Sequence, residues 1–191
     1  NTTRNPDELY KQTHELLGDV IDVTNFFIAI VDVKEQALYF PYWVDKTDED
    51  FSPIRNFDPE KSLTGLVVSE RRPILLNQEA LRGLSDKEAV CGSLPLIWMG
   101  VPLMIRDEVI GIIAVQSYTD ADLYDKTDLK LLSSISDQIA IAIDRKRTED
   151  ELRKSEKKYR YLFDHAPVGM YEIDFTEKKF NEVNGTFIKD T

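Results

Sequence analysis

The segment 100–117, which reads GVPLMIRDEVIGIIAVQS, constrains the fold more than any other part of the sequence. Two apolar runs flank the polar break Arg106-Asp107-Glu108, so the segment is predicted to form a β-hairpin. Neither run alternates between apolar and polar residues, and a strand that is apolar on both sides needs cover on both faces of its sheet. The hairpin is therefore expected in a sheet with structure packed on each face.

The composition is that of a soluble globular protein with one or two domains. The 191 residues are 42% hydrophobic and 31% charged, and no apolar run reaches the roughly 18 residues of a membrane helix. No signal peptide opens the sequence, so we expect a cytoplasmic location, which leaves membrane attachment of a parent protein open. A net charge of -11 disfavours nucleic acid and direct membrane contact. The single cysteine, Cys91, excludes an internal disulfide.

The chain before the hairpin is predicted to alternate helices with short strands. Asn5 and Pro6 fit the cap and first position of a helix over 7–24. Further along we expect strands over 26–33 and 37–44, a loop over 45–61, a helix over 63–70, a strand over 74–76, and one or two short helices within 78–90.

A long helix is predicted to leave the hairpin, with Asp125 as its cap and an apolar stripe over 129–143. Beyond that stripe the helix becomes almost wholly charged, and Pro167 stops it. Residues 167–187 are predicted to form two short strands, and because a lone hairpin is marginal in water, they are expected to begin a further domain.

Three segments, in this order, resemble a GAF domain: LTGLVVSERRPILL, MGVPLMIRDEVIGIIAVQSY and DLKLLSSISDQIAIAI. RKRTEDELRKSEKKYRYLFDHAPVGMYEIDF resembles the linker, opening helix and first strand of a PAS domain, and FNEVNGTF its second strand and the start of the next helix. The expected organisation is a GAF sensory domain over 1–147, a helical linker over 148–163, and the truncated start of a PAS domain over 164–191.

The GAF resemblance implies an α+β fold in which a central antiparallel sheet has the N- and C-terminal helices on one face. Short helices and loops would cover a pocket on the other face. One face of the hairpin would then pack against the helices of the core, and the other face would form a wall of the pocket. Apart from Cys91, the candidate ligand-binding residues lie on or near predicted strands. The alternative for the aromatic residues among them is an ordinary position in the hydrophobic core. They are Phe27, Tyr39, Trp43, Cys91, Trp98, Gln116 and Tyr118.

The resemblance further implies a sensory or regulatory module that binds an unidentified small molecule and relays through its last helix. A GAF–PAS tandem implies a sensor histidine kinase of a two-component system, with a diguanylate cyclase as the alternative output. A homodimer through the helices is expected, and the sequence names no cofactor. Rival interpretations are a ligand-free dimerisation scaffold, and a covalent chromophore, haem or redox sensor through Cys91.

No catalytic residue and no metal site are expected. The segment QTHELLGD, which contains His14, is similar to a histidine-kinase phosphoacceptor helix over three residues only. An ordinary surface position is therefore favoured for His14. The two histidines and one cysteine lack metal-ligand spacing. Tyr124 and Asp128 align with the end of a cyclic-nucleotide pattern, but Leu129 replaces its Glu. Neither a phosphate-binding loop nor a Ser or Cys triad is recognisable.

Overall fold

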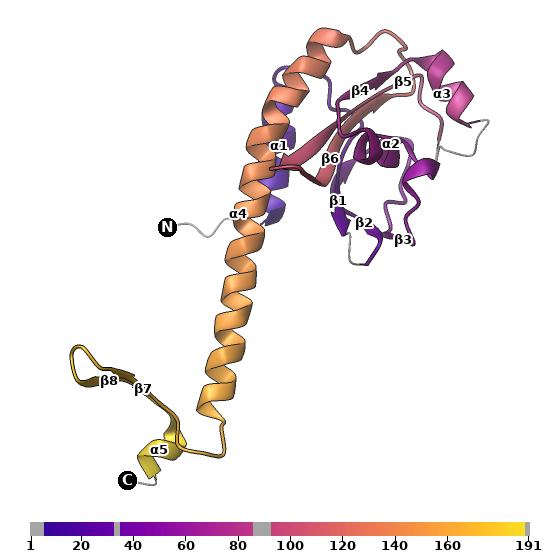
Figure 1. Ribbon diagram of the computed structural model, residues 1–191. Coiled ribbons are helices and arrows are strands. Elements are labelled where there is room, and N and C mark those ends of the chain that lie inside the picture. Colours follow the sequence, from indigo (N-terminus) through magenta and orange to yellow (C-terminus); the bar gives the residue numbers. More distant parts are fainter. Residues whose placement is uncertain (1–5, 33–34, 86–92, 190–191) are drawn as a thin grey trace. The chain divides into compact units, whose positions relative to one another are not determined.

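The computed structural model describes residues 6–32, 35–85 and 93–189, and the chain divides into two compact units, Asn1–Asp144 and Arg145–Thr191. The boundary falls within helix α4 (Lys126–Asp164). Before α4, the first unit contains α1 (Pro6–Gly18), β1 (Phe26–Asp32), β2 (Ala37–Val44), β3 (Ile54–Arg55), the 3-10 helix η1 (Pro59–Lys61), α2 (Leu63–Glu70), β4 (Ile74–Leu76), α3 (Gln78–Ser85), β5 (Ile97–Ile105) and β6 (Glu108–Ser117) (Figure 1).

The first unit is built on a six-stranded antiparallel sheet with the strand order β3-β2-β1-β6-β5-β4. The predicted hairpin is β5 and β6, which pair from Ile97 with Ser117 to Ile105 with Glu108. The edge strands β3 and β4 are only two and three residues long, and short edges offer little backbone for pairing with another chain. The hairpin therefore lies inside the sheet, between β1 and β4.

Both faces of the sheet are covered, which explains why the hairpin does not alternate. On one face Leu17 of α1 and Leu132 of α4 belong to the same buried cluster as Met99 of β5 and Val115 of β6. On the other face α2 and α3 contribute to a second buried cluster (Figure 1), whose members are Phe27, Ala29, Leu38, Leu63, Val67, Ile74, Leu81, Trp98, Ile112 and Ala114. The predicted α+β fold, with the first and last helices on one face, is confirmed.

Side-chain caps fix the starts of α2 and α4. The cap predicted at Asp125 forms as expected, and Asn5, the cap predicted for the first helix, lies outside the described residues. Ser62 caps α2 by accepting the Gly65 N–H at 2.8 Å, and Arg71 ends that helix in the left-handed conformation with φ 54°. At α4, the Asp125 carboxylate accepts the Asp128 N–H at 3.1 Å, and the Asp128 carboxylate accepts the Asp125 N–H at 2.8 Å. This reciprocal pair is a capping box that fixes where α4 begins.

The first helix is shorter than the sequence predicts. It ends at Gly18, because the Leu17 carbonyl accepts the N–H groups of both Val20 and Ile21 and the chain turns away from the helix axis. Val20, which fitted the predicted apolar stripe, is instead 54% exposed. The expectation that the helix reaches residue 24 was therefore wrong.

The segment 45–61, predicted as a loop, contains two short regular elements. Ile54 pairs with Leu38, which makes β3 the outermost strand of the sheet next to β2. Asp58 then caps η1 by accepting the Glu60 N–H. These elements bring the rest of the segment back over the sheet, where it forms part of the candidate site.

His14 ties α1 to the sheet. Its Nε2 lies 3.1 Å from the Val23 carbonyl oxygen and its Nδ1 3.2 Å from the Tyr42 hydroxyl. A carbonyl only accepts, so in the neutral ring Nε2–H donates to Val23 and Nδ1 accepts from Tyr42. The ring also packs 5.1 Å from Phe26. His14 is therefore half-buried and links α1 to the sheet. The prediction of an ordinary surface position was wrong.

Replacing His14 by Ala is expected to lower the free energy of unfolding by about 2 kcal/mol, because two hydrogen bonds of about 1 kcal/mol each are lost. Urea denaturation followed by far-UV circular dichroism measures the change. Lys11→Ala is the matched control, since Lys11 makes only an exposed ion pair with Glu15, worth a few tenths of a kcal/mol. Equal loss in the two variants would contradict the role given to His14.

The second unit contains the rest of α4, the hairpin of β7 (Tyr171–Asp174) and β8 (Lys179–Val183), and α5 (Gly185–Lys189). The fully buried Asn184 organises it. Its amide group donates to the carbonyls of Phe163 and Val168, both at 3.0 Å, and its side-chain oxygen accepts the N–H groups of Met170 and Phe187, both at 2.9 Å. One side chain thus joins the end of α4 to the hairpin and α5. Among the described residues, no helix combines the length and the apolarity needed to cross a membrane.

Candidate functional site

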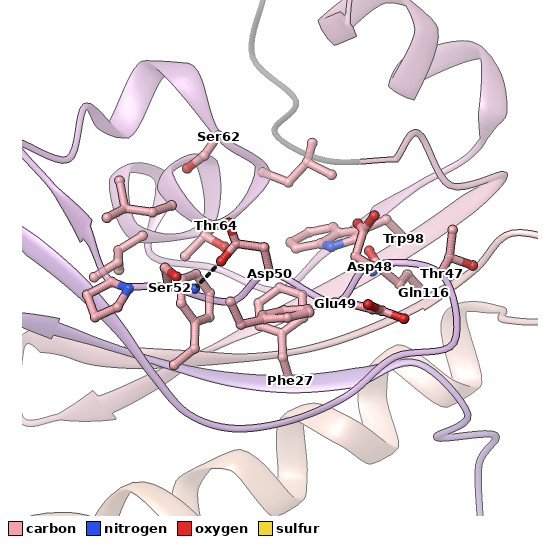
Figure 2. Close-up of a pocket in the computed structure, with 16 residues that line it drawn as sticks. Phe27, Thr47, Asp48, Glu49, Asp50, Ser52, Ser62, Thr64, Trp98 and Gln116 are labelled. Atoms are coloured by element: carbon pink, nitrogen blue, oxygen red, sulfur yellow. Dashed lines mark hydrogen bonds between the residues drawn. The ribbon is translucent and has the colours of Figure 1, made fainter.

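A cavity of about 660 Å³ lies on the face of the sheet opposite α1 and α4. Strands β1 and β2 contribute Phe27, Leu38 and Phe40, and the hairpin contributes Trp98 and Gln116. The remaining lining comes from the segment 47–54 and the start of α2 (Figure 2). This volume falls within the roughly 300–1,000 Å³ of small-molecule sites. The cavity is the candidate ligand-binding site.

Three phenyl rings that contact one another belong to the apolar part of the cavity. Phe40 meets Phe27 at 5.8 Å between ring centroids and Phe51 at 5.4 Å, both edge to face, and Phe27 lies 5.7 Å from Phe51. Trp43 stacks on Phe51 at 4.9 Å with 10° between the ring planes. Edge-to-face and offset-stacked pairs stabilise by about 1 kcal/mol each beyond their buried area. These contacts hold the segment 47–54 against the sheet.

Trp98 keeps its place in the cavity wall because residue 100 is glycine. The two residues stand on the same face of β5, and a Cβ atom added at Gly100 would lie 2.1 Å from the indole Cη2 of Trp98. Across the hairpin, Gly100 pairs with Ala114 and Trp98 with Gln116. The indole is only 1% exposed, so a larger residue at position 100 would have to push it into the cavity or the core.

Gln116 begins a chain of hydrogen bonds at the edge of the cavity. Its Nε2 donates to the Asp45 carboxylate at 2.8 Å and to the Tyr118 hydroxyl at 2.7 Å. The Tyr118 hydroxyl donates to the Asp48 carboxylate at 3.1 Å, and both oxygens of that carboxylate accept the Ser93 N–H at 3.2 Å. Burial, and then the charges of Asp45 and Asp48, raise the pKa of Tyr118 above its ordinary range. Tyr118 therefore stays protonated and joins the cavity to the end of β6.

The segment 47–54 gives the cavity its charge. It contributes the carboxylates of Asp48, Glu49 and Asp50 to the lining. The Ser52 hydroxyl and then the Ser52 backbone N–H, which lies 2.9 Å from the Asp50 carboxylate, hold the pKa of Asp50 below its ordinary range. Asp50 is therefore ionised at neutral pH. The cavity is apolar along the sheet and acidic along this segment.

The structure brings together some of the residues predicted to bind a ligand. Phe27, Trp98 and Gln116 line the cavity. Tyr118 lies one hydrogen bond behind Gln116, and Trp43 lies behind Phe51 rather than in the lining. Ligand binding by these residues stays a prediction.

Of the two other predicted residues, Tyr39 lies on the other face of the sheet and Cys91 is not described. Tyr39 pairs with Ile30, whose side chain packs with the cluster that contains α1 and α4, so Tyr39 belongs to the other face of the sheet. Its placement among the pocket residues was wrong because β2 was read without the irregularity in its pairing with β1 between Ile28 and Ile30. Cys91 lies outside the described residues, and the hypothesis of a tethered chromophore or a redox role stays open.

Sequence reasoning missed the lining residues of the segment 47–54 and of α2. Phe51 carried a usable signal: a large aromatic residue inside an acidic stretch with two prolines has a reason to fold back onto an apolar surface. Asp48 and Asp50 had no such signal, because a carboxylate in a polar segment is ordinarily solvated. Within the described parts of the chain, no group of three or more His, Cys, Asp or Glu side chains is arranged to hold a metal ion.

Comparison with known proteins places these features in a family. The GAF domain family profile matches residues 3–144. Among curated protein sequences, none matches the chain. Three solved structures resemble it: residues 122 to 287 of a methyl-accepting chemotaxis protein (TM-score 0.61, 20% identity, 75% of this chain and 92% of that chain), the GAF domain of a two-component sensor histidine kinase from Bacillus halodurans (0.58, 14%, 76% and 98%), and type II free methionine-R-sulfoxide reductase from Thermoplasma acidophilum (0.50, 19%, 69% and 92%). At these identities the likeness shows the fold alone.

Proposed function

The chain belongs to the GAF domain family through residues 3–144, and from this membership we propose that its first unit is a sensory module that binds a small molecule in the cavity over the sheet. GAF domains of this fold occur in signalling proteins, as the sensor histidine kinase illustrates. The observation that most supports this proposal is the cavity of about 660 Å³, which is lined by aromatic, amide and carboxylate side chains.

The relay would run from Gln116 to α4. A ligand that contacts Gln116 or Asp48 competes with the hydrogen bonds that both make to the Tyr118 hydroxyl. Tyr118 stands directly after β6, in the short connection to α4, and the Tyr124 hydroxyl anchors that connection by donating to the Asp22 carbonyl at 2.9 Å. Differential binding to two arrangements of this connection would bias α4, which is how a ligand shifts a population.

Native mass spectrometry tests the binding proposal. Protein purified from its own host is expected to carry a non-covalent small molecule that denaturation releases. Ser52→Phe, which adds a phenyl ring at the lining, is expected to abolish the added mass, whereas Ser155→Phe on the exposed part of α4 leaves it unchanged. The same small molecule retained in both variants would place the ligand outside this cavity, and ligand-free protein would support the scaffold alternative.

A sensor without catalytic activity is the form of the proposal that we favour. One of the similar structures is a sulfoxide reductase, so the GAF fold alone does not decide whether the protein is an enzyme. In favour of a binding module, the cavity lining among the described residues contains Ser and Thr hydroxyls but no Cys, and no His that could activate those hydroxyls as nucleophiles. Visible absorbance of the purified protein tests the alternative that Cys91 holds a chromophore or haem, since either group would colour the protein.

The second unit is proposed to be the start of a PAS domain within a cytoplasmic part of a sensor histidine kinase. The order β7, β8, α5 agrees with the strands and helix of the resemblance, and α4 supplies the helix that precedes them. The parent gene is expected to encode the remaining strands of the PAS domain and then a kinase module. A diguanylate cyclase in that position would contradict the proposed output and leave the sensory role intact.

A homodimer through the helices is also proposed. Leu16 and Ile141 are 70% and 57% exposed on α1 and α4, and a second copy would cover such side chains at an interface of paired helices. The same surface would serve a ligand-free scaffold, so dimerisation alone does not separate the two functions.

A further inference from the structure

Among the described residues, the charged side chains that line the cavity all have the same sign. Asp48, Glu49 and Asp50 contribute three carboxylates, and among the described residues that form the lining none is Lys, Arg or His. Figure 2 shows Asp48 in the region of Trp98 and Gln116, and Asp50 nearer Thr64, so the negative charge is spread along the cavity rather than gathered at one point. An anionic ligand would meet three like charges and no basic partner.

The aromatic side chains favour the same kind of ligand. Phe27, Phe40 and Phe51 stand at steep angles to one another, from 52° to 79° between ring planes, and Trp98 adds an indole to the lining. The faces of aromatic rings are electron-rich and attract cations within about 6 Å. Their edges and faces also bury apolar groups. A ligand with both an ammonium group and an apolar body would use the whole lining.

One feature of the cavity works in the opposite direction. The N-terminal end of α2 contributes Ser62, Leu63 and Thr64 to the lining, and a helix N-terminus carries the equivalent of about +0.5 charge. Part of that end is already used, since the Ser62 hydroxyl and carbonyl oxygens accept the N–H groups of Gly65 and Leu66. Half a positive charge does not offset three carboxylates, so the cavity stays negative.

We propose that the cavity binds an organic cation, an ammonium compound with an aromatic or other apolar body. This inference rests on the proposed sensory function, because it names the chemical class of the ligand for the same cavity. The ammonium group would lie against the carboxylates of Asp48, Glu49 and Asp50, and the apolar body against Phe27 and the rings that it contacts.

Three probes that share one ring and differ in charge test this class. They are 2-phenylethylammonium, 2-phenylethanol and phenylacetate. In a Trp43→Phe background, which leaves Trp98 as the sole tryptophan, quenching of indole fluorescence reports binding at the cavity wall, and saturation-transfer NMR confirms it. The cation is expected to bind about tenfold more tightly than the alcohol, the sum of a cation–π contact and exposed ion pairs, and phenylacetate more weakly than either.

Charge variants identify the groups responsible. Asp50→Asn is expected to weaken binding of 2-phenylethylammonium about fivefold and to leave binding of 2-phenylethanol unchanged, and Glu49→Gln is expected to act in the same direction. Asp19→Asn is the matched control: it removes the same charge from an exposed site in the turn that follows α1, on the opposite face of the sheet, and should change neither affinity. High salt should reduce the preference for the cation.

Several results would overturn the inference. Equal or tighter binding of the alcohol or the anion would exclude a cation-selective site while leaving the cavity as a binding site, so the proposed sensory function would stand. An anionic molecule that copurifies in native mass spectrometry would likewise exclude a cation-selective site and leave the proposed sensory function standing. Failure of 2-phenylethylammonium to bind at about 10 mM, a concentration that reveals even a millimolar dissociation constant, would also overturn it. Protein without any copurified or added ligand would contradict the proposed function as well.

Discussion

Gly100→Ala is expected to displace the indole of Trp98 and to destabilise the first unit by about 3 kcal/mol, the upper part of the range for overpacked cores. The added methyl group would lie 2.1 Å from Cη2 of Trp98, far inside contact distance. The indole cannot swing aside freely, because it is 1% exposed and packs in the cluster that contains Phe27 and Leu63. Either the ring moves into the cavity or the hairpin shifts.

The measurement is urea denaturation together with the emission spectrum of Trp98 in the Trp43→Phe background. Gly83→Ala is the matched control, since nothing lies within 4 Å of a Cβ atom at that position in α3, and Ala in a helix is more stable than Gly by up to about 1 kcal/mol. Gly100→Ala should also weaken any ligand bound in the cavity, whereas Gly83→Ala should not.

A double-mutant cycle separates the clash from other effects of the methyl group. Trp98→Leu alone should cost about 3 kcal/mol through the lost indole. Adding Gly100→Ala to Trp98→Leu should then cost far less than Gly100→Ala alone, because the ring it would meet is gone. Additive losses would show that residue 100 acts through β5 itself rather than through Trp98.

The central fold was predictable from the sequence because its signals are local. The hairpin of β5 and β6 follows from two apolar runs around a polar break, and their lack of alternation correctly indicated cover on both faces. The cap of α4 was also predicted, since Asp125 acts on an N–H group three residues along the chain. The GAF resemblance supplied the layer order that these local signals leave open.

The candidate site was predictable only in part because contacts between distant segments form it. Gln116 was recognisable as an odd polar residue on a buried strand, but its partners Asp45 and Tyr118 come from the ends of two strands. The path of the segment 47–54 depends on Phe51 packing against Phe40, which no periodicity reveals. His14 likewise gained its role from Tyr42, far along the chain. Helical or strand spacing does not encode such contacts.

Ile139→Glu combined with Ile143→Glu is expected to unfold the first unit. If the expected homodimer paired along the apolar stripe of 129–143, these substitutions would dissolve it and leave the sheet intact. The structure contradicts that expectation, because Ile139 and Ile143 are 6% and 2% exposed and belong to the core between α4 and the sheet. An uncompensated buried charge costs about 4 kcal/mol, so two cost about 8 kcal/mol, which is comparable to the whole stability of a typical domain, about 5–15 kcal/mol.

Dimerisation has to be tested on the opposite side of α4. Ile141 lies two residues from both Ile139 and Ile143, roughly 200° around the helix, and is 57% exposed. Leu16→Glu with Ile141→Glu is therefore expected to leave the unfolding curve within about 1 kcal/mol of the parent. If the helices pair as proposed, sedimentation at about 100 µM shows a dimer for the parent and a monomer for this variant. A folded Ile139→Glu, Ile143→Glu protein would contradict the core assignment, and a parent that is already monomeric would contradict the proposed dimer. One variant places two carboxylates on the buried face of α4, and the other places two on exposed positions of α1 and α4, so their difference shows which surface the fold needs and which surface a second copy would use.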